Sequence, residues 1–358
     1  MKVFTLAGLL AIAIGTVGCS TSGHFVYVVG AGSNSVVALQ QTPAGKLVAL
    51  TSVSATTDSV PVSIIVHPSA KFVYVANFAG NDVTLFAASN KGTLTVPKDL
   101  TTNNPLGPFN VGTGPVALAV TPGGQFLYVL NGGSNSISAF SVDSSTGNLT
   151  AVSGSPFATA TGPVSMAVSG NGKFLYVANP ALHTVSGFTI ASGGGLTAMT
   201  GSPFSAGAAP SWVAVDSGSK FLFVADVSAN QILGFTIDAN SGAPTAISGS
   251  PFAAGAQPTS LAIDSHNGVL VAANRGSNNI SVYSINSGSG ALTQVSGSPF
   301  TTGTAPVFVA VDSTNRFVYV GDSGSNDIAA FSIVNGNVVS LSGSPFNIPT
   351  SPAWIASQ

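Results

Sequence analysis

The chain has few charged residues and a single cysteine. Of its 358 residues, 9 are Lys or Arg and 11 are Asp or Glu, so the charged fraction is 6% and the formal net charge is −2. Without a basic stripe that could neutralise phosphates, we expect no nucleic-acid partner. One cysteine excludes a stabilising disulfide within the chain. A polar surface built from Ser, Thr, Asn and Gly fits an exported protein better than a cytosolic enzyme that handles phosphorylated metabolites.

The sequence also lacks the patterns of most catalytic folds. No stretch has the sustained 3.6-residue period of a helix, which a βαβ fold would need. No Gly-rich loop ends in Lys and Ser or Thr, as a phosphate-binding loop does. His266 lies near Asp264, but no third residue completes a triad or a metal site. We therefore expect no cofactor and no metal ion.

The chain does contain a repeated unit. Each copy has a Pro-led apolar stretch, a second stretch similar to Lys-Phe-Leu-Tyr-Val-Ala-Asn, a turn that contains Asn, and in most copies Gly-Ser-Pro-Phe. Seven prolines head the unit at steps of 54, 48, 47, 48, 48 and 46 residues: Pro61, Pro115, Pro163, Pro210, Pro258, Pro306 and Pro352. Self-similarity at this period is typical of stacked or radial repeats.

Each repeat predicts four short antiparallel strands. The copy that begins at Pro210 reads SWVAVD, KFLFVAD, QILGFTID and GAPTAISGSPF, and each piece is bounded by turn residues. Four strands in roughly 40 to 50 residues make one blade of a β-propeller. The sequence therefore predicts an all-β fold, a seven-bladed β-propeller, in one domain over residues 24–358.

The two ends of the repeat array complement each other. The first copy starts at His24 with a second strand, whereas residues 352–358 (PAWIASQ) form a Pro-led first strand with nothing after it. We expect the C-terminal strand to complete the N-terminal blade, because such closure removes the exposed sheet edge of an open array.

The first 23 residues lie outside the repeats. Lys2 precedes an apolar run from Val3 to Val17, and Gly18-Cys19 follow. This order predicts a signal peptide over 1–18 and a short tether over 19–23. Thr16 to Cys19 resemble the bacterial lipobox, which implies lipidation of Cys19, although Thr16 departs from the usual Leu. The expected location is then the cell envelope, where the lipid anchors the chain to the bacterial membrane, at the outer membrane and periplasm or at the cell surface. The alternatives are an ordinary cleaved signal, hence secretion, or an uncleaved anchor.

Seven copies make their exceptions visible. Two positions after the heading proline, four residues are small and three are aromatic: Trp212, Phe308 and Trp354. Alternation along the strand places this position on the channel side. The three rings can form the wall of a ligand pocket, or they can plug the channel mouth as core residues.

Other exceptions occur where the second strand ends. Arg275 is the one basic residue directly after this position, and Asp226 and Asp322 replace the usual Asn in the two neighbouring blades. His183 replaces Asn four residues further on, in the fourth blade. The Asp and Asn residues are also ordinary turn formers, His183 can be a solvated loop residue, and Arg275 can make surface pairs of little energetic value.

Together these exceptions predict a pocket at one sector of the channel mouth. Aromatic walls and an Arg fork are typical of a site for a small molecule or a glycan. The ligand-binding residues we predict are Trp212, Phe308, Trp354, Arg275 and His183. If the protein is an enzyme, Arg275, Asp226 and Asp322 are its catalytic candidates.

The repeats resemble a known family. KFVYVANFAGNDVTLF (71–86), KFLYVANPALHTVSGF (173–188) and AANRGSNNISVY (272–283) resemble YVTN repeats and the seven-bladed lactonase family that includes 6-phosphogluconolactonase. The resemblance implies a channel-mouth set of His, two Arg and Glu that acts on a lactone.

Only one residue of that set is matched. Arg275 matches the later Arg, Ser211 stands at the earlier Arg, and Asp226-Val227 replace an Asn-Glu pair. The matching segment at 162–168 (GPVSMAV) has no His. We therefore expect an exported, monomeric binding or scaffold propeller for a small molecule, glycan or protein. The alternative is a lactone hydrolase with a degenerate catalytic set.

Overall fold

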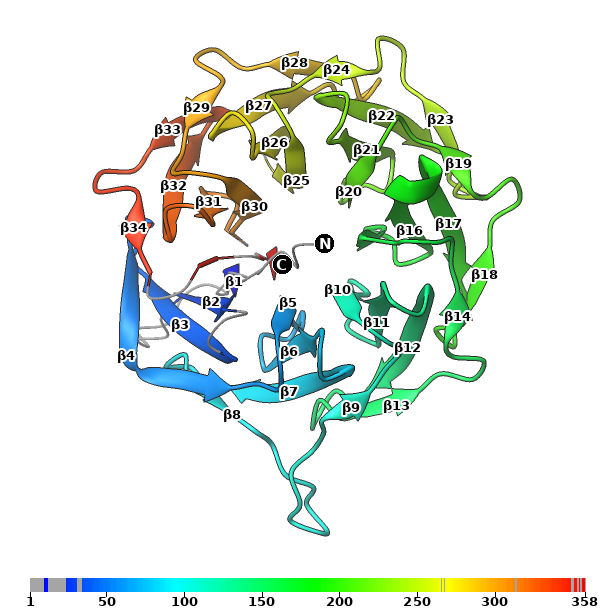
Figure 1. The fold of residues 1–358 in the computed structure, drawn as a ribbon, viewed down its shortest axis with the longest axis vertical. Coiled ribbons are helices and arrows are strands. Elements are labelled where there is room, and N and C mark those ends of the chain that lie inside the picture. The colour runs from blue at the N-terminus through cyan, green and yellow to red at the C-terminus, as the bar shows by residue number, and fades with distance from the viewer. Residues whose placement is uncertain are drawn as a thin grey trace.

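The protein forms a ring of seven β-sheets around a central axis (Figure 1). The computed structural model describes residues 10–11, 24–30, 34–264, 266, 268–312, 314–348, 351–352, 354 and 356–357. Six of the sheets are blades built from consecutive strands, and the seventh joins the two ends of the chain. The prediction of a seven-bladed, all-β propeller is confirmed. Within the described residues the one helical element is a 3₁₀ turn, η1 (Pro180–Leu182).

Each of the first four blades is a five-stranded sheet that runs from the inside of the ring outward. Blade one contains β35 (Ala356–Ser357), β1 (Leu10–Ala11), β2 (His24–Gly30), β3 (Ser35–Gln41) and β4 (Leu47–Thr56). Blade two contains β5 (Pro61–Val66), β6 (Phe72–Asn77), β7 (Asp82–Ala88), β8 (Leu94–Thr95) and β9 (Phe109–Asn110). Blade three contains β10 (Pro115–Val120), β11 (Phe126–Asn131), β12 (Ser136–Val142), β13 (Leu149–Ala151) and β14 (Phe157–Ala158). Blade four contains β15 (Ser165–Val168), β16 (Phe174–Asn179), β17 (Thr184–Ile190), β18 (Leu196–Ala198) and β19 (Phe204–Ser205).

The last three blades repeat this order. Blade five contains β20 (Pro210–Val215), β21 (Phe221–Asp226), β22 (Gln231–Ile237), β23 (Pro244–Ala246) and β24 (Phe252–Ala253). Blade six contains β25 (Pro258–Asp264), β26 (Val269–Asn274), β27 (Asn279–Ile285), β28 (Leu292–Gln294) and β29 (Phe300–Thr301). Blade seven contains β30 (Pro306–Val311), β31 (Phe317–Asp322), β32 (Asp327–Val334), β33 (Asn337–Ser340) and β34 (Phe346–Asn347).

The second strand of each blade lies in the core. Every residue of β6, β16, β21, β26 and β31 is buried, because both faces of the blade pack against neighbouring blades. This explains why these stretches are nearly continuous apolar runs. Tyrosines in the second strands also form hydrogen bonds to the next blade. The Tyr128 hydroxyl donates to the Gly194 carbonyl at 2.9 Å, and Tyr74 and Tyr176 make the same bond to Gly147 and Gly242.

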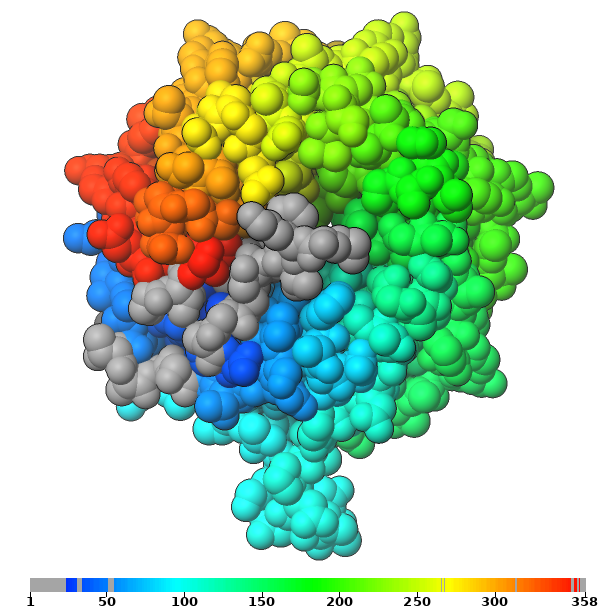
Figure 2. Space-filling model, in the orientation of Figure 1, coloured from blue at the N-terminus to red at the C-terminus, as the bar shows by residue number. Residues whose placement is uncertain are grey.

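The outermost strand is not continuous. In blades two to seven it consists of two short pieces, such as β13 and β14, and both pair with the third strand β12. The Gly-Ser-Pro-Phe segment lies between the pieces, with a cis Ser–Pro bond at Ser155–Pro156 and its equivalents. Blade two carries an insertion there, which projects from the rim with Leu100 92% exposed (Figure 1, Figure 2). This insertion accounts for the 54-residue step in the repeat.

The ring closes in blade one. The C-terminal strand β35 belongs to the sheet of the N-terminal blade, as predicted, but β1 lies between β35 and β2. β35 runs parallel to β1 and β1 antiparallel to β2, so β35 has the direction of an innermost strand. Side chains also join blades seven and one: Tyr319 donates to the Gly45 carbonyl at 2.8 Å, and Gln41 Nε2 donates to Asp312 Oδ2 at 3.2 Å.

The role of residues 1–18 as a signal peptide stays a prediction, and Cys19 lies outside the described residues. Among the residues that the structure describes, no helix is long and apolar enough to cross a membrane.

Candidate functional site

A cavity of about 380 Å³ lies at the channel mouth between blades four, five, six, seven and one. Ten residues line it: Val164, Ser211, Trp212, Val227, Gln257, Thr259, Arg275, Val307, Phe308 and Trp354. The cavity therefore contains the three aromatic residues and the arginine that the sequence singled out. Its volume fits a ligand of one or two rings rather than a polymer.

The three aromatic rings form a single cluster. The centroid of the Trp212 ring lies 5.1 Å from that of Phe308 and 4.8 Å from that of Trp354, and Phe308 and Trp354 are 5.2 Å apart. Because these residues come from blades five, seven and one, their contact confirms that this position of the first strand faces the channel. Phe308 and Trp354 are buried, at 4% and 7% exposure, whereas Trp212 is half-buried. Two of the rings therefore act as core residues, and Trp212 offers the larger surface to the cavity.

Arg275 contributes the charge of the cavity. It follows β26 directly, and its backbone N–H donates to the Gln257 carbonyl at 2.9 Å. Gln257 has a positive φ of 55°, and its own N–H donates to Asn230 Oδ1 at 2.8 Å. These two bonds fix the connection between blades five and six. They hold the backbones of Arg275 and Gln257 beside each other, and both residues line the cavity.

Asp226 does not line the cavity. It is fully buried, and its carboxylate accepts hydrogen bonds from the backbone N–H groups of Ala208, Ala209 and Ala229 and from Gln231 Nε2. Burial alone would raise the pKa of Asp226, but these four donors lower it overall. Asp226 is therefore an ionised carboxylate that holds its own turn together.

Asp322 does not line the cavity either. It is fully buried beside Asp327, the residue opposite it in the strand pair. Burial raises its pKa to about 8, and the neighbouring Asp327 adds to this, against weaker opposing effects of the Gly303 N–H and the Thr302 hydroxyl. Asp322 is thus a neutral carboxylic acid near pH 7. Its catalytic role stays a prediction that the geometry does not support, and the same holds for Asp226.

His183 lies in the turn after η1, away from the cavity lining. It has a positive φ of 59°, is exposed, and its Nδ1 contacts the Ala208 carbonyl oxygen. The asparagines at this position in other blades also have positive φ, and five of them accept a hydrogen bond from the residue before the next heading proline: Asn34, Asn81, Asn135, Asn230 and Asn278. His183 thus takes the place of a structural clamp, and a ligand-binding role for it stays a prediction.

The sequence analysis predicted no ligand-binding role for the other residues of the lining. Val164, Ser211, Thr259 and Val307 all line the cavity, and each directly follows the heading proline of its blade. Trp212 and Phe308 mark the next position of the same strands. A scan of that neighbouring register would have found these four residues.

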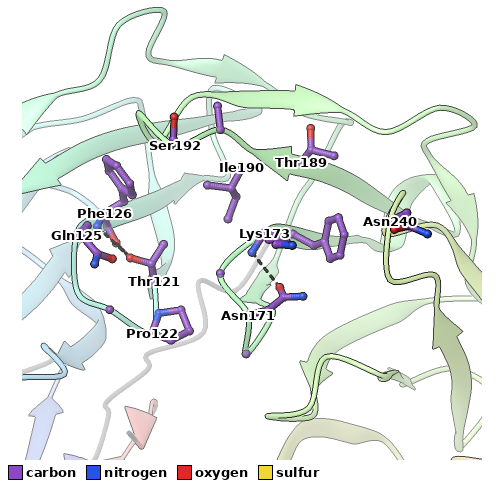
Figure 3. Close-up of a pocket in the computed structure, with 15 residues that line it drawn as sticks. Thr121, Pro122, Gln125, Phe126, Asn171, Lys173, Thr189, Ile190, Ser192 and Asn240 are labelled. Carbon is purple, nitrogen blue, oxygen red and sulfur yellow. Dashed lines mark hydrogen bonds between the residues drawn. The ribbon is translucent and has the colours of Figure 1, made fainter.

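A larger hollow, of about 620 Å³, lies at the other end of the strands (Figure 3). Gln125, Asn171 and Lys173 line it from turns of blades three and four, and the Lys173 N–H donates to Asn171 Oδ1 at 3.0 Å. Of its two aromatic residues Phe174 is buried, and the ring of Phe126 is partly buried beside Gly194. The same turn elements recur between other blades, so we assign this hollow no role. Among the described residues, no group of three His, Cys, Asp or Glu could hold a metal ion.

The fold and this cavity define a seven-bladed propeller with a ligand-sized pocket at the mouth of its channel. The chain belongs to the lactonase family of seven-bladed β-propellers, whose model matches residues 20–309. No curated protein matches the chain.

Solved structures share the fold at low sequence identity. A putative 6-phosphogluconolactonase from Bacteroides fragilis is 19% identical with a TM-score of 0.72, and the alignment covers 97% of this chain and 96% of that chain. A putative 6-phosphogluconolactonase from Bacteroides uniformis is 18% identical with a TM-score of 0.71, and the alignment covers 97% of this chain and 98% of that chain. A periplasmic gluconolactonase from Pseudomonas aeruginosa is 18% identical with a TM-score of 0.68, over 97% and 98%. At such identities the likeness shows the fold alone.

Proposed function

We propose that this protein is a binding propeller that holds a small molecule in the channel-mouth cavity and does not hydrolyse it. One observation carries the proposal. Ser211 and Val227, which stand where the lactonase set has an Arg and a Glu, line the same cavity as Arg275. The cavity therefore lies where the family has its site and contains one of that site's cations, Arg275. The positions of the other Arg and of the Glu hold the neutral hydroxyl of Ser211 and the apolar side chain of Val227.

Hydrolysis would need a base beside the ligand, and the described lining contains none. The two nearby acids are fully buried, and Asp226 is committed to four hydrogen bonds. A general base must come within about 3 Å of the proton it removes, directly or through one water. The second candidate function, lactone hydrolysis, is supported by Arg275 alone, which could stabilise an oxyanion.

Incubation of the purified protein with a panel of γ- and δ-lactones tests the proposal. We expect no hydrolysis above the buffer rate. The Arg275→Ala variant is the control: lactone turnover that this substitution abolishes would establish the hydrolase and refute the binding role.

We also propose that the propeller is exported and anchored in the cell envelope through a lipid on Cys19, acting there as a monomer. The apolar run before Gly18-Cys19 and the sparse charge support this location. Mass spectrometry of the mature N-terminus tests it. An unmodified N-terminus at a residue other than Cys19 would contradict the lipid anchor: a cleaved chain would leave secretion, and a chain that keeps Met1 would leave an uncleaved anchor.

A further inference from the structure

The walls of the cavity are mainly apolar. Three valines, Val164, Val227 and Val307, line it together with Trp212 and Phe308. A sugar or an open polyol placed against such walls would leave several hydroxyl groups without partners, at a cost of about 1–3 kcal/mol for each group. The walls therefore favour a ligand whose body is apolar and flat.

The hydroxyl groups in the lining already donate their protons to backbone carbonyls. Ser211 Oγ donates to the carbonyls of Pro258 and Ala225, at 2.8 and 3.2 Å. Thr259 Oγ1 donates to the carbonyls of Pro306 and Ala273, at 3.3 Å in both cases. The other polar side chains of the lining are Gln257, with its amide, and Arg275, whose guanidinium carries several N–H donors.

The charge of the lining is that of one cation. Arg275 is the one charged residue among the ten, and the lining includes no Lys, Asp or Glu. A guanidinium pairs with a carboxylate through two parallel N–H···O bonds, which is stronger and more directional than pairing with a neutral oxygen. A planar carboxylate on the ligand therefore matches the Arg275 side chain better than a neutral hydroxyl or carbonyl oxygen does.

We propose that the cavity binds a monocarboxylate with a flat apolar body, such as an aryl carboxylate. The carboxylate lies against Arg275 and Gln257, and the ring lies between Trp212 and the valines. The inference rests on the proposed binding function and narrows it to one ligand class. Neutral sugars and lactones are then poor ligands, although their rings are of similar size.

The protein carries its own reporter of this binding. Its two tryptophans, Trp212 and Trp354, both line the cavity, so tryptophan fluorescence, excited selectively over the tyrosines, comes from the site itself. We would titrate the full chain with benzoate, phenylacetate and cinnamate, and with methyl benzoate, methyl phenylacetate, glucose and glucono-δ-lactone. We expect saturable fluorescence changes with the acids, and at least tenfold weaker binding of each methyl ester than of its acid.

Matched variants separate the role of the charge from that of the fold. Arg275→Gln should weaken the acids at least tenfold and leave the esters unchanged. Arg316→Gln is the control, because Arg316 is exposed in the turn before β31, outside the cavity lining, and should bind like the wild type. Gln257→Gly keeps a residue that tolerates positive φ and should weaken the acids by a smaller factor.

Each outcome has one meaning. Equal binding of acids and esters, or acid binding that survives Arg275→Gln, would overturn the carboxylate class. Saturable binding of glucose or the lactone without hydrolysis would overturn the class and leave the binding function standing. Hydrolysis of the lactone would refute the binding function itself, and a lack of response to every compound would overturn the inference.

Discussion

At the scale of single residues, the end of the second strand carries two alternative hydrogen-bond systems. In blades two, three, four and six this residue is Asn, and its amide donates to a hydroxyl seven positions on: Thr84, Ser138, Ser186 and Ser281. In blades five and seven it is Asp, and the residue seven positions on is Leu233 or Ala329. An ionised Asp cannot donate as the Asn amide does, and it needs hydrogen-bond donors around it. Asp226 has four of them, whereas Asp322 faces a second carboxyl group, that of Asp327.

This difference predicts a pH-dependent stability that comes from Asp322. Its folded-state pKa of about 8 lies above the unfolded value of 3.8, so the folded state binds more protons between these two values. The free energy of unfolding should therefore fall as the pH rises from about 4 to about 8, by on the order of 5 kcal/mol. Asp322→Asn should remove most of this fall, because the amide can donate to Asp327 as Asn77 does to Asp82 at 2.6 Å. Denaturant unfolding at pH 5 and pH 9 measures the effect.

Asp226→Asn is the matched comparison. Its pKa is lowered, so the ionised form is the stable one, and an amide would turn an NH₂ group towards backbone donors. We expect a loss of about 1–3 kcal/mol at both pH values. If Asp322→Asn showed the same pH-independent loss, the neutral acid at position 322 would be refuted.

At the scale of elements, the interrupted outer strand is held by one repeated serine. The hydroxyl oxygen of Ser202 accepts a hydrogen bond from the Gly187 N–H of β17 at 3.0 Å, and Ser155, Ser250, Ser298 and Ser344 make the equivalent bond in their blades. The serine thereby replaces the ladder bond that is lost where the strand breaks. This explains why the segment recurs in nearly every copy.

We therefore predict that Ser202→Ala destabilises the protein by about 1 kcal/mol, because the Gly187 N–H loses its partner. Thermal unfolding followed by circular dichroism measures the change. Ser192→Ala, at an exposed position of the β17–β18 turn, serves as the control and should melt like the wild type. Equal melting temperatures of both variants would show that the serine bond contributes nothing.

The sequence predicted elements better than it predicted side-chain directions. Strands one to three follow from runs of β-branched and aromatic residues between turn signals, and all seven blades form there. The break in the fourth strand could not be predicted, because it depends on pairing of both pieces with the third strand. The departures from the repeat correctly predicted that Trp212, Phe308, Trp354 and Arg275 line one cavity. They did not predict the positions of the Asp226 and Asp322 side chains, because the side chain of a strand-end residue can point into its own hairpin as easily as into the channel.

At the scale of the whole molecule, ring closure and the ligand cavity depend on the same segment. Trp354 comes from the C-terminal residues that complete blade one, and it packs against Phe308 of blade seven and Trp212 of blade five. Blades seven and one also meet through Tyr319 and Gly45 and through Gln41 and Asp312, outside that segment. The ring is therefore closed by two sets of contacts: those of the C-terminal segment on the inside, and the side-chain hydrogen bonds between blades seven and one.

Deletion of residues 352–358 should open the ring from the inside. The truncated chain loses the innermost strand β35 and the Trp354 side chain, so an unpaired strand edge and an apolar surface become exposed. We expect a lower melting temperature and a larger radius of gyration by small-angle X-ray scattering, together with loss of the ligand-dependent fluorescence change. Trp354→Ala separates the two contributions: it should lose about 3–5 kcal/mol and the cavity wall but keep the compact radius, because the rest of the C-terminal segment is still present. A truncated protein as stable and as compact as the full chain would mean that the contacts between blades seven and one close the ring without the C-terminal strand.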